Sequence, residues 1–125
     1  MHILAVDYGT KNIGLAWVDT GIGVALPFGV IKGGKTAAEE MVKFIQKEKI
    51  DTVVFGLPLG MSNAENPNTK RIREFAEQVE NLAGVKIDFV NEMFSSQMAD
   101  RSEPGVSRDE KSAMIILEDY LQKNK

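Results

Sequence analysis

The sequence contains no cysteine. This excludes disulfide bonds and thiolate metal sites, and it favours a reducing compartment. The first residues lack the basic segment and apolar core of a signal peptide. No apolar run approaches the roughly 20 residues that a transmembrane helix needs. We therefore expect a cytoplasmic protein without a membrane partner.

The sequence also lacks an excess of basic residues. Its 125 residues include 15 Lys and Arg against 18 Asp and Glu, which gives a net charge of −3. Such a chain has no overall attraction to nucleic acid, so a polyanionic partner would need a local basic patch or bound metal ions. Repeats, low-complexity segments and linkers are absent as well. We expect one domain over residues 1–125.

The apolar pattern predicts three short strands followed by alternating helices and strands. Gly9 and Gly14 are expected to permit tight turning in the first hairpin. Tight connections between the first three strands indicate an antiparallel meander, and the later alternation indicates a mixed α/β sheet with helices on its faces. The expected strands are 2–7, 14–19, 24–31, 51–57 and 86–90, and the expected helices are 36–49, 66–84 and 108–122.

Three carboxylates stand at unusual places. Asp7 ends a run of apolar residues that is typical of a buried strand, and Glu92 follows the strand KIDFV after one intervening residue. Asp109 lies four residues before Ala113, so it shares the apolar stripe of the last helix. If the three side chains converge, their mutual repulsion calls for a divalent cation. Oxygen ligands favour Mg²⁺ or Mn²⁺ over zinc.

Each carboxylate also has a simpler explanation. Asp7 could accept hydrogen bonds that hold the turn at residues 8–10. Glu92 could be an ordinary surface residue. Asp109 could stabilise the first turn of its helix through the helix dipole, which contributes about 0.3–1 kcal/mol.

Five motifs together resemble the YqgF family, the Holliday-junction-resolvase-like branch of the ribonuclease H-like fold. The resemblance implies a five-stranded sheet with three antiparallel strands and then two parallel ones. It also implies a nuclease that hydrolyses phosphodiester bonds in 5′-end processing of pre-16S rRNA. The motifs are DYGTKNIGLA (7–16), FGLPLGMSN (55–63), NTKRIREFA (68–76), NEMFSSQMA (91–99) and DEKSAMIILEDYL (109–121).

The resemblance places the acidic catalytic site of the family on Asp7, Glu92 and Asp109, where these residues would hold Mg²⁺ or Mn²⁺ beside the scissile phosphate. The chain departs from the family pattern at Met93, where arginine is usual, and in a short segment over residues 100–108. Ser112 stands where resolvases often carry a fourth acid. This difference favours a metal-dependent nuclease over a Holliday junction resolvase, which stays an alternative.

Basic residues are sparse but well placed for a nucleic acid partner. Lys11 follows the first acidic motif, and Arg71 and Arg73 lie early in the second predicted helix. We expect these three to contact nucleic acid, which would be structured RNA or branched DNA. Alternatively, this helix face is simply solvated, with Lys70 and Arg73 paired to the glutamates four residues later.

Two further functions compete with the nuclease hypothesis. Met93 and the short 100–108 segment are compatible with a nucleic-acid-binding module of weak catalytic activity. A strand followed by DYGT also resembles the phosphate loop of actin-like ATPases. Those enzymes close two such domains around a nucleotide, and this length supplies only one.

Overall fold

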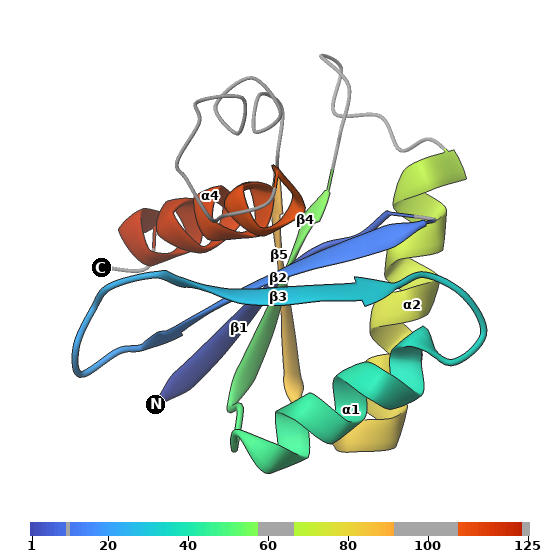
Figure 1. The fold of residues 1–125 in the computed structure, drawn as a ribbon, viewed down its shortest axis with the longest axis horizontal. Coiled ribbons are helices and arrows are strands. Elements are labelled where there is room, and N and C mark those ends of the chain that lie inside the picture. The colour runs from blue at the N-terminus through green and yellow to red at the C-terminus, as the bar shows by residue number, and fades with distance from the viewer. Residues whose placement is uncertain (10, 58–66, 92–107, 124–125) are drawn as a thin grey trace.

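A computed structural model describes residues 1–9, 11–57, 67–91 and 108–123 of the chain (Figure 1). Within these residues the predicted mixed α/β fold is confirmed, with five strands in one sheet and three helices. None of the described helices is long and apolar enough to span a membrane. The elements are β1 (His2–Asp7), β2 (Asn12–Asp19), β3 (Leu26–Lys32), α1 (Ala37–Lys47), β4 (Thr52–Leu57), α2 (Pro67–Ala83), β5 (Lys86–Asn91) and α4 (Arg108–Lys123).

The strands lie in the order β3-β2-β1-β4-β5. β1 pairs antiparallel with β2, and β2 with β3, whereas β4 runs parallel to both β1 and β5. This is the predicted arrangement of three antiparallel and two parallel strands. The parallel strands β1, β4 and β5 therefore end at the same end of the sheet, where β2 begins and β3 finishes. In open α/β sheets this end is the usual place for ligand-binding groups.

The strand boundaries differ slightly from the predicted ones at the β2–β3 hairpin. β2 begins at Asn12 because this residue still pairs with Lys32. β3 begins only at Leu26, because the backbone N–H groups of Ile22 and Gly23 both donate to the carbonyl of Asp19 and form a turn. Val24 is apolar but exposed, and it lies between this turn and β3, which explains the early predicted start.

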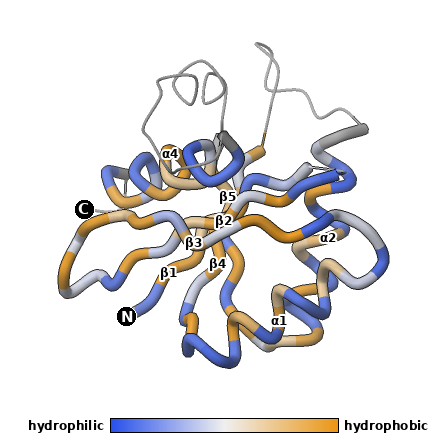
Figure 2. Tube along the Cα trace, viewed as in Figure 1, coloured by the Kyte–Doolittle hydropathy of each residue, from blue (hydrophilic) through white to orange (hydrophobic). Residues whose placement is uncertain are grey.

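Helices cover both faces of the sheet, α1 and α2 on one side and α4 on the other (Figures 1 and 2). Each face carries its own core. Side chains alternate along a strand, so Leu4 and Val6 of β1 pack toward α1 and α2. Ile3 and Ala5 pack on the opposite face, against α4. Every residue of β4 is buried, as expected for a strand covered on both sides.

Candidate active site

The alternation of β1 decides where its last residues point. Asp7 continues the face of Ile3 and Ala5, toward α4, whereas Tyr8 follows the face of Leu4 and Val6, toward α2. Two adjacent residues therefore reach opposite sides of the sheet at the end where the parallel strands finish. The candidate acidic site lies on the α4 side.

Gly14 brings α4 to the acidic residue of β1. Gly14 lies directly opposite Asp7 in the antiparallel pair of β1 and β2. A Cβ atom at Gly14 would collide with the backbone carbonyl of Asp109 and would lie only 2.9 Å from its Cα atom. The first turn of α4 can rest on β2 at this point only because glycine has no side chain. The role predicted for Gly14 in turning the hairpin is thus replaced by a packing role, whereas Gly9 does approach the carbonyl of Asn12 closely.

The electrostatics of Asp7 depend on this contact. The pKa of its carboxyl group is raised from 3.8 to about 6, chiefly by burial and then by the nearby negative charge of Asp109. The hydroxyl of Ser112 donates a hydrogen bond to the carboxylate and partly offsets the rise. Ser112 is itself buried, one helical turn beyond Asp109. At neutral pH the fold thus holds two repelling carboxylates together, one of them desolvated.

This donor set fits a hard divalent cation. Carboxylate and hydroxyl oxygens are the ligands that Mg²⁺ and Mn²⁺ prefer, and a positive charge would offset the repulsion between Asp7 and Asp109. Within the described ranges, no group of three His, Cys, Asp or Glu side chains could hold a metal ion. The third predicted acid, Glu92, lies outside those ranges. The residue before it, Asn91, ends β5 opposite Leu57, at the same end of the sheet as Asp7.

The predicted basic residues are placed around this end, but not together. Lys11 is exposed, and its carbonyl accepts a hydrogen bond from the N–H of Gly33 at 2.9 Å. Arg71 is exposed on α2 and lines a cleft with Tyr8. The guanidinium of Arg73 lies 5.0 Å from the ring centre of Phe89 in edge strand β5. Arg71 and Arg73 therefore occupy different surroundings, and a structural cation–π contact accounts for the position of Arg73.

Three residues that shape this end of the sheet were not predicted to do so from the sequence. Gly14 could have been found from the register, because it faces Asp7 across the first hairpin. Ser112 could have been found from helical spacing, since it lies three residues after Asp109. Tyr8 carried no signal beyond its aromatic ring at the end of an apolar strand.

The family model named RuvX and described as "Holliday junction resolvase" matches residues 1–123. A protein of Maridesulfovibrio salexigens named "Putative pre-16S rRNA nuclease" is 33% identical and aligns over 97% of this chain and 98% of its own. A protein of Porphyromonas gingivalis with the same name is 34% identical, over 96% and 95%.

Two solved structures confirm the predicted fold. Thermus thermophilus RuvC in complex with a Holliday junction substrate superposes with a TM-score of 0.60 at 13% identity, over 98% of this chain and 96% of that one. The fowlpox virus Holliday junction resolvase superposes with a TM-score of 0.61 at 14% identity, over the whole of both chains.

Replacing Gly14 by alanine tests whether the helix contact positions the acids. The added methyl group must push the first turn of α4 away from β2, so we expect a loss of about 1–3 kcal/mol in the free energy of unfolding. Because Asp109 moves with the helix, we also expect the pKa of Asp7 to fall toward its ordinary value. Urea denaturation and an NMR titration of the carboxyl groups measure the two effects.

Gly21→Ala is the matched control in the turn after the same strand. A Cβ atom there would meet only the side chain of Asp19, at 3.3 Å. This variant should change the free energy of unfolding by no more than about 0.5 kcal/mol. It should leave the pKa of Asp7 unchanged. If Gly14→Ala proved as harmless as Gly21→Ala, the close packing of α4 would not be what holds the acids together.

Proposed function

Because this chain belongs to the RuvX family of Holliday junction resolvases, we propose that it is a divalent-metal-dependent nuclease that hydrolyses phosphodiester bonds. The resemblance of its motifs to the YqgF family points to the same activity. The observation that carries the proposal is the close approach of Asp7 and Asp109, which leaves a partly buried carboxylate with a raised pKa at the end of the sheet where the parallel strands finish. Perturbed carboxyl groups of this kind are typical of functional sites. We further infer that residues 1–125 act as one nuclease domain in the cytoplasm.

The proposed substrate is the precursor of 16S ribosomal RNA, cleaved during 5′-end processing. Support comes from relatives over 30% identical that carry that name and align along nearly their whole length. A second candidate substrate is Holliday junction DNA, which the description of the family favours. Comparing cleavage of a pre-16S rRNA fragment with cleavage of a four-way DNA junction separates the two.

We assign the acidic residues as follows. Asp7 and Asp109 supply carboxylate oxygens to Mg²⁺ or Mn²⁺, and Glu92 is the third ligand by its family position. Such a cation, when bound, activates water for attack and offsets the negative charge that develops on the phosphate. Ser112 fixes the orientation of the Asp7 carboxylate through its hydrogen bond. Ser112 is neutral, so the described part of the site carries less negative charge than one with a fourth acid would.

We also propose that Lys11 and Arg71 bind the phosphate backbone of the substrate. Both are exposed and border the end of the sheet where Asp7 lies. Arg73 has weaker support for this role, because its guanidinium lies over Phe89. Lys11 and Arg71 would attract the phosphate backbone locally, although the net charge of the chain is −3.

Asp7→Asn tests the proposed catalytic role. The substitution keeps the shape of the side chain but removes the charge that a cation needs. We expect cleavage of the rRNA fragment in Mg²⁺ or Mn²⁺ to fall at least about 100-fold. In metal-free buffer the melting temperature should stay equal or rise, because one of two repelling charges is gone.

Asp51→Asn is the control substitution. Asp51 lies just before β4 and accepts a hydrogen bond from the backbone N–H of His2. It is therefore at the start of β1, whereas Asp7 is at its end. It should leave cleavage unchanged. The opposite pattern for Asp7→Asn, with cleavage retained and a lower melting temperature in metal-free buffer, would make Asp7 a structural acceptor and refute its catalytic role.

The salt dependence of RNA binding tests the role of Arg71. Removing one phosphate contact releases one counterion fewer, so Arg71→Gln should weaken binding and reduce the log–log salt slope by about 0.7–0.9. Lys47→Gln makes the same change in net charge at the far end of α1 and should leave the slope unchanged. An identical slope in wild type and Arg71→Gln would assign Arg71 to the surface of α2 without a phosphate contact.

A further inference from the structure

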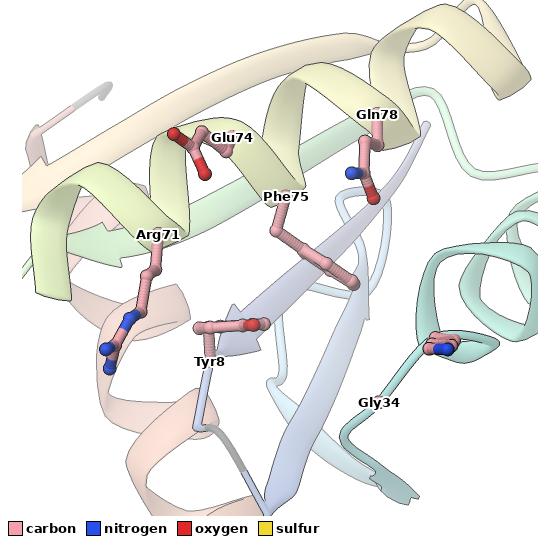
Figure 3. Close-up of a pocket in the computed structure, with 7 residues that line it drawn as sticks. Tyr8, Gly34, Arg71, Glu74, Phe75 and Gln78 are labelled. Atoms are coloured by element: carbon pink, nitrogen blue, oxygen red, sulfur yellow. The ribbon is translucent and has the colours of Figure 1, made fainter.

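A cleft of about 620 Å³ lies beside Tyr8 on the α2 side of the sheet, opposite Asp7 and Asp109. Figure 3 shows residues that line it. Its walls come from the end of β1, the segment before α1, and one face of α2. The cleft combines aromatic rings with two cations, one carboxylate and one amide. Its lining residues are Tyr8, Gly34, Lys35, Arg71, Glu74, Phe75 and Gln78.

The aromatic part of the cleft is held rigidly. The ring centres of Tyr8 and Phe75 lie 4.8 Å apart with a tilt of 37°. Phe75 is buried and also meets the fully buried ring of Phe55 edge-on at 6.1 Å. Tyr8 itself is only partly buried. A surface ring anchored on buried rings offers a stacking platform that loses little conformational freedom when a planar group binds.

The charged groups border that platform. Figure 3 shows the side chain of Arg71 extending from α2 past the ring of Tyr8. Lys35 also lines the cleft, on the wall formed by the segment before α1. Lys11 is close to this wall along the backbone, because its carbonyl accepts the N–H of Gly33. An aromatic ring flanked by exposed cations is the arrangement by which proteins bind unpaired nucleotides, with the base stacked and the phosphate paired.

The position of Tyr8 links the cleft to the acidic site. Adjacent Cα atoms are about 3.8 Å apart, and the side chains of Asp7 and Tyr8 leave the strand on opposite faces. A nucleic acid strand that crosses the end of the sheet with one phosphate at Asp7 would therefore bring a neighbouring nucleotide to Tyr8.

We propose that the cleft binds an unpaired nucleotide next to the scissile phosphate, with its base stacked on Tyr8 and its phosphate held by Arg71. The proposal rests on the proposed nuclease function and makes it specific for a single-stranded segment beside the cleaved bond. Bases within a continuous duplex are stacked on their neighbours and cannot enter the cleft. Gln78, which has both a donor and an acceptor, lies within the same cleft and can contact the edge of the base.

Fluorescence of 2-aminopurine tests this assignment, because stacking on an aromatic ring quenches it. A single-stranded RNA with 2-aminopurine at each position in turn is bound to the Asp7→Asn protein, which prevents cleavage. We expect quenching at one position, which neighbours the bond that the wild-type protein cleaves. Tyr8→Leu in the same background should abolish the quenching and lower RNA affinity about 5- to 100-fold. Tyr8→Phe should preserve both.

Phe28→Leu is the matched control, because Phe28 is another partly buried ring that packs on the same core at β3. It should preserve the quenching and the affinity. Equal quenching at every RNA position in the Asp7→Asn protein would overturn the assignment whether or not the Tyr8 variants fold. Equal effects of Tyr8→Leu and Phe28→Leu would overturn it too.

The outcomes also separate this inference from the proposed function. If wild type cleaves RNA and Asp7→Asn does not, while Tyr8→Leu leaves the quenching unchanged, the cleft assignment fails and the nuclease function stands. If wild type cleaves neither RNA nor junction DNA, while quenching still depends on Tyr8, the nuclease function fails and only the nucleotide-binding role of the cleft remains.

Discussion

The contact between Gly14 and the backbone of Asp109 is the constraint on which the acidic site depends. It allows the first turn of α4 to touch β2 directly opposite Asp7. Through this contact the helix places both Asp109 and Ser112 next to the carboxylate of Asp7, at the end of β1. The cost is electrostatic, because a partly desolvated acid is held beside another negative charge. Such an arrangement of repelling carboxylates is typical of sites where a cation or a substrate offsets the repulsion.

Because side chains alternate along β1, the two sides of this end of the sheet carry different groups. Asp7 faces α4 and the acidic pair, and Tyr8 faces α2 and the aromatic cleft. A strand of nucleic acid laid across the end of the sheet would meet negative, cation-binding groups on one side and a stacking ring with Arg71 on the other. The net charge of −3 is consistent with this division, because attraction to a polyanion is needed only locally.

Much of the fold could be predicted from hydrophobic periodicity, because the sheet is covered on both faces and β4 is continuously apolar. The carboxylates Asp7 and Asp109 could be singled out because each interrupts an apolar face. The hairpin register could place Gly14 opposite Asp7, but its contact with α4 could not be predicted, because that helix begins only at Arg108. Helical spacing already distinguished the two arginines, because Arg71 lies one turn before Phe75. The structure places Arg71 at the cleft with Tyr8 and the guanidinium of Arg73 over Phe89.

The most direct test of the acidic site as a cation site is the pKa of Asp7, measured by carboxyl NMR with and without Mg²⁺. In metal-free buffer the pKa should lie at about 6, and Asp109→Asn should lower it by removing the neighbouring charge. At saturating Mg²⁺ the pKa in the wild-type protein should fall below the ordinary value of 3.8, because a bound cation stabilises the carboxylate. A pKa that stays near 6 in Mg²⁺ would contradict the assignment of Asp7 as a cation ligand.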